Sequence, residues 1–163
     1  MAAEGIDMSE AASHGLLLRH GQPADRPAMA ELWVASWART LPEIDFQTRR
    51  DWLEGHIDTL LANGAQLTVG VMDGRVAGFV IIHPATGYLD QLAVHPDFWG
   101  QGAAEALMDG ARGISPTLVA LDVNQENPRA VRFYEKIGLK VVGEGENPAS
   151  GRRTFRMEWR PLA

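Results

Sequence analysis

The strongest constraint on the fold is a strand pattern that runs through a glycine turn into a helix pattern, over residues 89–112. Leu89, Leu92 and Val94 supply the apolar side chains of the strand, and Pro96 ends it because proline cannot donate a hydrogen bond to a sheet. The turn at 99–104 reads Trp-Gly-Gln-Gly-Ala-Ala, and the apolar helix pattern after it is expected to end at Gly113. Strand, glycine turn and helix together direct free backbone N–H groups and the helix dipole at an anion.

Two common phosphate-binding motifs do not fit this turn. The dinucleotide-binding fingerprint needs a third glycine, which residues 103–105 do not supply, and the P-loop needs Gly-Lys-Ser/Thr. The only lysines are Lys136 and Lys140, far from the turn. Taken alone, a Gly-x-Gly before a helix is equally well explained as a tight turn without a ligand.

A second motif follows in residues 121–144. Residues 118–123 are typical of a buried strand, Asn127 is a good helix N-cap, Pro128 suits the first helical position, and Gly138 suits the helix end. One face of this helix is expected to point inward, through Ala130, Phe133, Tyr134 and Ile137.

The two motifs, V-x-P-x-x-x-G-x-G-x-A and N-x-x-N-x-x-A-x-x-F-Y-x-K-x-G-L, resemble those of the GNAT superfamily of N-acetyltransferases. The resemblance implies one α/β domain over residues 16–163. Its sheet would be mixed but mostly antiparallel, with about six to seven strands, helices on both faces and a splayed parallel pair at the centre. It also implies acetyl-CoA as the acyl donor, with no metal, and a primary amine as the acceptor.

In such proteins the pantetheine arm of the cofactor fills the gap between the splayed strands, and the pyrophosphate lies on the glycine turn. Backbone groups of Leu92 and Val94 are the expected partners of the arm. Trp99 stands where the family often has Gln or Arg, so a side-chain contribution to phosphate binding is not expected there. The cofactor-binding residues implied by the resemblance are Leu92, Ala93, Val94, Trp99, Gly100, Gln101, Gly102, Ala103, Ala104, Asn127, Ala130 and Phe133.

The resemblance assigns the acid that protonates the departing thiolate to Tyr134, although helix spacing alone also fits a core tyrosine. Asp90 is the candidate base, acting directly or through a water. Strand alternation places Asp90 on the face of Leu92 and Val94, with Gln91 opposite; a β-bulge would reverse this assignment. His83 and His95 flank turns and are expected to be structural.

Two other functions are compatible with parts of the sequence. One is a GNAT-like module that binds acyl-CoA without catalysis. The other follows from residues 16–22, Leu-Leu-Leu-Arg-His-Gly-Gln, which are similar to the signature of histidine phosphatases. Histidine phosphatases also need a second histidine site late in the chain. This chain has none there, because its last histidine is His95.

Composition narrows the function further. A net charge of −6 argues against nucleic acid as a primary partner, and the absence of cysteine excludes disulfides and Cys-based metal sites. Residues 1–15 are expected to form a disordered leader rather than a signal peptide, and no run is long enough to span a membrane. We therefore expect a cytoplasmic protein, and the family resemblance makes a homodimer possible.

The rest of the chain predicts two helices and two hairpins. Asp25 is expected to cap a helix that ends at Pro42, and a second helix should cover 47–62 with Trp52 among its inward residues. An acidic cluster on and before this second helix is either a solvated face or a wall that attracts a cationic acceptor. The predicted strands are 66–72 and 76–82, joined by a type I′ turn at Asp73-Gly74, then 88–94, and finally 141–145 paired with 154–159.

Overall fold

The computed structural model describes residues 15–162, so nearly all of the predicted leader lies outside the described residues. The strands are β1 (Leu16–His20), β2 (Gln66–Met72), β3 (Arg75–His83), β4 (Tyr88–Val94), β5 (Val119–Asn124), β6 (Lys140–Glu146) and β7 (Arg153–Trp159). The α-helices are α2 (Arg26–Thr40), α3 (Arg50–Ala62), α4 (Ala103–Ile114) and α5 (Pro128–Lys136), with short 3-10 turns η1 (Pro23–Asp25), η2 (Phe46–Arg49) and η3 (Pro96–Phe98).

Within residues 15–162 the strands form one seven-stranded sheet in the order β1-β2-β3-β4-β5-β7-β6. Every neighbouring pair is antiparallel except β4 and β5, which are parallel. The expected α/β class, with a mixed and mostly antiparallel sheet and a central parallel pair, is confirmed.

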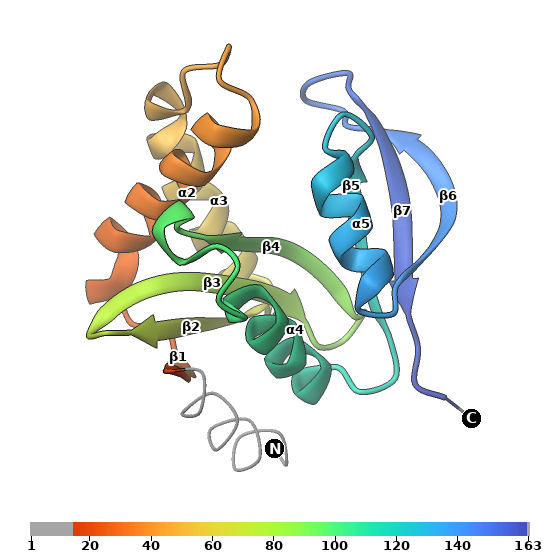
Figure 1. Ribbon diagram of the computed structural model, residues 1–163, viewed down its shortest axis with the longest axis horizontal. Coiled ribbons are helices and arrows are strands. Elements are labelled where there is room, and N and C mark those ends of the chain that lie inside the picture. Colours follow the sequence, from red (N-terminus) through yellow and green to blue (C-terminus); the bar gives the residue numbers. More distant parts are fainter. Residues whose placement is uncertain (1–14, 163) are drawn as a thin grey trace.

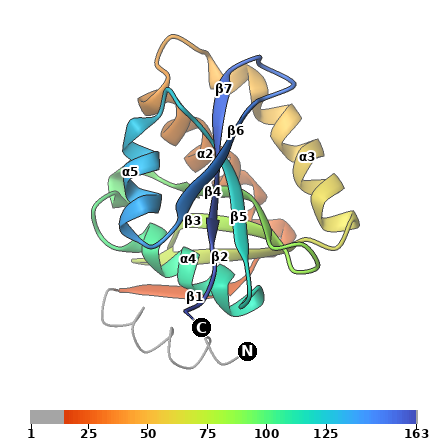
Figure 2. The same cartoon turned by 90° about the vertical axis from the view of Figure 1, so that its right-hand side faces the viewer.

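Helices cover both faces of the sheet, as predicted, and each face has its own apolar core. One core joins α4 to alternate residues of the sheet, with Leu107, Met108 and Val80 among its fully buried side chains. The other joins α2 and α3 to the opposite face, through Leu32, Ile57 and other buried residues. Figure 2 shows α3 on one side of the sheet and α4 with α5 on the other.

Several local expectations are confirmed. Asp73 and Gly74 have φ values of 53° and 73°, the two positive values that a type I′ turn requires. The helix at 47–62 is present as η2 followed by α3, and α2 ends just before Leu41-Pro42.

Three local expectations were wrong. Helix α4 passes through Gly113 and ends at Ile114; the hydroxyl of the C-cap residue, Ser115, donates to the carbonyl of Leu118 at 2.6 Å and so fixes the path of the chain after the helix. Asp25 lies at the N-cap of α2, but its carboxylate instead accepts hydrogen bonds from Arg19 at 2.8 Å. Trp52 was expected to be buried and is 53% exposed, because it lies over the pocket described below.

The central feature of the sheet is the separation of β4 from β5. Their pairing is confined to Tyr88 opposite Ala120, where the Ala120 N–H donates to the carbonyl of Gly87 at 2.9 Å. Beyond this point the two strands diverge, and the second half of the sheet with α5 stands away from the first (Figure 1). The splayed pair expected from the family resemblance is therefore present.

A polar cluster holds the closed end of the splay. The Tyr88 hydroxyl donates to Asp122 Oδ2 at 2.8 Å, and Arg156 donates to both Asp122 oxygens at 2.9 and 3.1 Å. Burial opposes ionisation of Asp122, but the hydrogen bonds from Arg156 and Tyr88 hold the pKa of this carboxyl below its usual value. The cluster thus connects β4, β5 and β7 across the junction.

Among the described helices, none has the length and apolar character that crossing a membrane requires.

Candidate functional site

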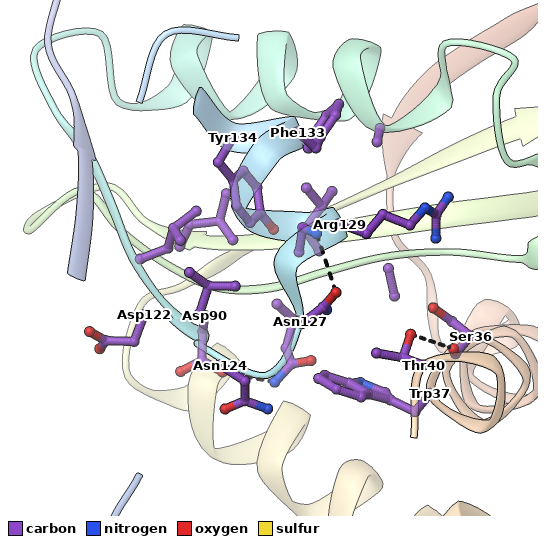
Figure 3. A pocket seen from close by; sticks show the side chains of 18 of the residues that line it. Ser36, Trp37, Thr40, Asp90, Asp122, Asn124, Asn127, Arg129, Phe133 and Tyr134 are labelled. Atoms are coloured by element: carbon purple, nitrogen blue, oxygen red, sulfur yellow. Dashed lines mark hydrogen bonds between the residues drawn. The ribbon is translucent and has the colours of Figure 1, made fainter. Parts of the chain in front are cut away.

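A cleft of about 1090 Å³ occupies the splay between β4 and β5. Its lining comes from both halves of the molecule: α2 and α3 on one side, α5 and the β6–β7 turn on the other, and the start of α4 at one end. Figure 3 shows the labelled side chains of α2, of the strands and of α5 arranged around this one pocket.

The β4 wall presents backbone groups to the cleft. His95 N–H donates to the carbonyl of Ala77 at 2.7 Å, and hydrogen-bonded pairs alternate along an antiparallel ladder. Ala93 therefore directs its backbone groups toward β3, whereas Leu92 and Val94 direct theirs toward the β5 side. The prediction that Leu92 and Val94 are the strand-like partners of a ligand fits this register, and a backbone role for Ala93 does not.

The glycine turn has the conformation its sequence predicts. Gly100 and Gly102 have φ values of 79° and 85°, which other residues adopt only with strain. The first helical bond of α4 runs from the Ala106 N–H to the Gly102 carbonyl at 3.0 Å, so the preceding N–H groups lack partners within the helix. Gln101 turns its side chain back to the carbonyl of Asp97 at 3.1 Å, which leaves only its backbone for a ligand.

Trp99 has a structural role in this turn. Its indole Nε1–H donates to the Val94 carbonyl at 2.8 Å and ties the turn to the end of β4. The guanidinium of Arg129, from α5, lies 3.8 Å from the centre of the indole ring, and that of Arg39, from α2, lies 5.9 Å away. Two cations thus flank the residue that replaces the family's common Gln or Arg. The sequence motif gave no signal for either arginine, because both reach Trp99 only through the fold.

Helix α5 and its N-cap residue bring four predicted residues to the cleft. Asn127 accepts a hydrogen bond from the Ala130 N–H at 3.2 Å and so caps the helix as expected. Tyr134 is half-buried, and its hydroxyl makes no hydrogen bond to another described residue (Figure 3). Burial raises the pKa of Tyr134 to about 12, so the phenol keeps its proton at neutral pH. Ala130 and Phe133 line the same cleft.

Asp90 is positioned by a β-bulge. Ile81 of β3 pairs with Gln91 and Ile82 pairs with Leu89, so Asp90 is the extra residue of β4. The bulge turns Asp90 to the face of α3, opposite the face of Leu92 and Val94. The assignment from simple alternation was therefore wrong, and the bulge alternative is confirmed.

The bulge brings Asp90 to a residue that the sequence did not single out. Asp90 Oδ1 lies 2.7 Å from His56 Nε2 of α3 and also accepts a hydrogen bond from Gln91 Nε2 at 3.2 Å. The His56 ring stacks on Trp52, with ring centres 4.6 Å apart and planes inclined by 15°. A histidine in an amphipathic helix gives no sequence signal of this contact, since His56 and Asp90 are 34 positions apart.

The remaining polar lining is mixed in charge. Carboxylates contributed by the strands and the β6–β7 hairpin are Asp90, Asp122, Glu144 and Glu146. The cationic residues of the lining are Arg129, which lies beside Trp99 of the glycine turn, Lys136 of α5, and Arg156, which donates hydrogen bonds to Asp122. In residues 15–162 no group of three or more His, Cys, Asp or Glu side chains is arranged to hold a metal ion. His20 of the phosphatase-like stretch ends the edge strand β1 and is not part of this lining.

Comparisons with known proteins give one consistent result. The profile of the Acetyltransferase (GNAT) family matches residues 26–139. The peptidyl-lysine N-acetyltransferase YiaC of Escherichia coli K12 is 32% identical over 143 residues, covering 88% of this chain and 96% of that protein. The peptidyl-lysine N-acetyltransferase YjaB of Salmonella typhimurium is 36% identical over 121 residues, covering 71% and 80%.

Solved structures show the same fold at lower identity. The solution structure of apo-form YjaB from Escherichia coli superposes with a TM-score of 0.72 at 24% identity, covering 88% of this chain and 97% of that one. The coenzyme A complex of the PaiA N-acetyltransferase from Thermoplasma acidophilum gives a TM-score of 0.72 at 19% identity, covering 90% and 99%.

Proposed function

The chain belongs to the acetyltransferase (GNAT) family, acetyl-CoA-dependent N-acetyltransferases, and from this premise we propose that its acceptor is the side-chain amine of a lysine in a protein or peptide. The observation that carries the proposal is the cleft itself, which runs from the phosphate-type turn of α4 to an acidic, aromatic end between α3 and the β6–β7 turn. Such an arrangement suits a phosphate-bearing donor at one end and a cationic acceptor at the other.

Two observations support a lysine as the acceptor. The relatives that cover most of this chain carry the name peptidyl-lysine N-acetyltransferase. The acceptor end also holds Asp90 and the exposed indole of Trp52, and a carboxylate beside an aromatic face attracts an alkyl ammonium.

At the donor end of the cleft, backbone groups of β4 and of the glycine turn would bind acetyl-CoA. The pantetheine arm would pair with the outward backbone groups of Leu92 and Val94, with the Val94 carbonyl already shared with Trp99. The pyrophosphate would lie on the N–H groups of Gly100 to Ala104, and Arg129 beside Trp99 supplies a positive charge near it.

Transfer requires the movement of protons. An alkyl ammonium with a pKa near ~10.4 must lose a proton before its nitrogen can attack the thioester carbon. The carbon–sulfur bond then breaks, and the thiolate takes a proton from the Tyr134 hydroxyl. Tyr134 suits this role because it is protonated at neutral pH and has no competing hydrogen-bond partner among the described residues. Asp90 is the sequence's candidate for the proton acceptor.

The experiment that tests the proposal is a two-part assay. Calorimetry should show micromolar binding of acetyl-CoA, with ATP and NAD as negative controls. A lysine-containing peptide with a blocked N-terminus should then gain one acetyl group with release of free thiol, whereas the same peptide with Lys→Arg should not. Binding without transfer to any amine would favour the non-catalytic acyl-CoA module instead, and absence of binding would refute both.

We also propose that the protein is cytoplasmic and that it forms a homodimer. The first proposal is based on composition and the second on the family resemblance. Analytical ultracentrifugation of the purified chain measures the second directly.

A further inference from the structure

We propose that His56 receives the proton of the acceptor ammonium, directly or through one water, and that Asp90 acts through His56 as its positioning partner. This inference rests on the proposed function and names the proton path at the same site. It replaces the simpler assignment in which the Asp90 carboxylate is itself the base.

The first support is the contact between the two side chains. His56 Nε2 lies 2.7 Å from Asp90 Oδ1, and the same oxygen accepts a second hydrogen bond from Gln91. A neutral imidazole has one N–H donor and one acceptor nitrogen. When Nε2–H donates to the carboxylate, Nδ1 becomes the acceptor, and a proton arriving there gives an imidazolium that the carboxylate stabilises.

The second support is the placement of the ring. His56 lines the cleft and is the one imidazole among the described residues that do so. Stacking on Trp52 at 4.6 Å and the bond to Asp90 fix both the plane and the rotation of the ring. The side chain of His56 is 27% exposed, so a proton taken from the substrate can pass on to solvent.

The third support is the match of proton affinities. A general base works best when its pKa lies near the operating pH. Imidazoles ordinarily titrate near ~6.5 and aspartates near ~3.9, so an imidazole is the better acceptor for an ammonium proton at neutral pH.

One N–H bond of the ammonium breaks and its proton binds the His56 ring. The amine lone pair forms the new carbon–nitrogen bond, and the carbon–sulfur electron pair leaves with the thiolate, which is protonated by Tyr134. The second proton of the attacking nitrogen restores the Tyr134 hydroxyl. The net products are the amide, free CoA thiol and one proton released through His56.

The pH dependence identifies the base. In the wild type, kcat/KM for a lysine peptide should change less than about threefold between pH 7.5 and 9.5, because the enzyme takes up the ammonium proton itself. In His56→Gln, kcat/KM should rise about tenfold per pH unit. Without a base in the site, only the fraction of peptide whose lysine is already a free amine can react, and that fraction rises about tenfold per pH unit below the lysine pKa. The variant should therefore be about 100-fold slower at pH 7.5 and nearly equal at pH 9.5.

Other ionisable groups border the site and must be considered when the profile is read. They are Asp90 and Tyr88 on β4, Glu105 on α4, Asp122 on β5, Arg129, Tyr134 and Lys136 on α5, Glu144 and Glu146 on β6, and Arg156 on β7. Glu54 of α3, which Arg26 binds, is outside the lining. His56→Gln removes the hydrogen-bond partner of Asp90 and leaves the other groups in place, so the separate Asp90→Asn variant is needed to account for the contribution of Asp90.

Two further variants separate the roles. Asp90→Asn keeps the imidazole of His56, so this variant should have a lower kcat/KM but the same flat pH profile as the wild type. Imidazole added to the assay should restore activity to His56→Gln but not to Asp90→Asn. His83→Gln, a histidine outside the cleft lining, should match the wild type. If instead Asp90→Asn shows the steep profile and His56→Gln the flat one, Asp90 is the base and the inference is wrong.

Failure of the inference differs from failure of the proposed function. A wild type that transfers nothing to the lysine peptide refutes the proposed acceptor, and with it this inference. Normal wild-type turnover with a pH-independent loss in His56→Gln refutes the role of His56 alone, since a merely structural residue lowers the rate equally at every pH.

Discussion

At the scale of the residue, burial and single contacts set the chemistry of the cleft. Tyr134 is half-buried, its hydroxyl has no hydrogen-bond partner among the described residues, and burial raises its pKa to about 12, which keeps the proton in place. His56 and Asp90 hold each other at 2.7 Å on the other side of the cleft. A proton donor and a proton acceptor are thus kept apart by the space that the two substrates would fill.

Replacing Tyr134 by phenylalanine removes the acid and leaves the packing nearly unchanged. We expect kcat to fall by about 100-fold, within the usual contribution of general acid catalysis, while the Kd for acetyl-CoA stays within about twofold. Because the pKa of Tyr134 is raised, the wild type should lose no activity from this group until the pH approaches 12. Steady-state kinetics and calorimetry measure the two quantities. Loss of acetyl-CoA binding in the variant would contradict the assigned role.

The carboxyl groups of Asp25 and Asp122 predict a loss of stability in acid. Hydrogen bonds from Arg19 lower the pKa of Asp25, and those from Arg156 and Tyr88 outweigh burial to lower the pKa of Asp122. A lowered pKa in the folded state gives stability that is present above the ordinary value near ~3.9 and is lost as the pH falls through the folded value.

Denaturant unfolding at pH 7 and pH 3 measures this effect. The difference in unfolding free energy between the two pH values should be smaller in Asp25→Asn and in Asp122→Asn than in the wild type. Asp73→Asn, at the exposed hairpin turn, is the control and should keep the wild-type difference. Equal differences in all four proteins would show that neither ion pair contributes.

At the scale of the element, the glycine turn and the β4 bulge position the site. Gly100 and Gly102 take positive φ values so that α4 can start with its free N–H groups facing the cleft. The bulge at Asp90 changes the face of one residue and so brings it to α3. Both devices depend on backbone geometry, which is why side-chain periodicity predicts them poorly.

A pair of glycine substitutions separates backbone strain from ligand contact. Gly100 and Gly64 have φ values of 79° and 93°, and an added Cβ would meet no atom within 4 Å at either position. Gly100→Ala and Gly64→Ala should each cost about 1 kcal/mol of stability. Only Gly100→Ala should weaken acetyl-CoA, by about tenfold or more, because its methyl group lies where the phosphate would approach. Thermal unfolding and calorimetry test this, and equal affinities would remove Gly100 from the donor site.

At the scale of the whole molecule, β4 and β5 pair only at Tyr88 and Ala120, and the two halves of the sheet are held together by the Tyr88–Asp122–Arg156 cluster and by the apolar core that both halves form with α4. The contact of Arg129 with Trp99 connects them again near the glycine turn. A ligand that fills the splay would complete the sheet and hold both halves.

Acetyl-CoA should therefore stabilise the protein as a unit. At 100 times its Kd a ligand adds about 2.7 kcal/mol, which for a domain of this size raises Tm by roughly 5–10 °C. Hydrogen exchange should slow at the amides of Leu92 and Val94, which face the splay, and change less at Gln91 and Ala93, which pair with β3. Protection of the second pair rather than the first would show that the cofactor does not lie along β4.

The sequence alone determined the order of the elements, the family, the glycine turn, the capping role of Asn127 and the candidate acid Tyr134, because each depends on residues that are close together in the chain. Only the tertiary structure decided which face Asp90 occupies, that His56 reaches it, that Trp52 is exposed over that contact, and that Arg129 lies on Trp99. These contacts join α3 to β4 and α5 to the glycine turn. They depend on a bulge and on the angle between two halves of a sheet, neither of which leaves a periodic pattern in the sequence.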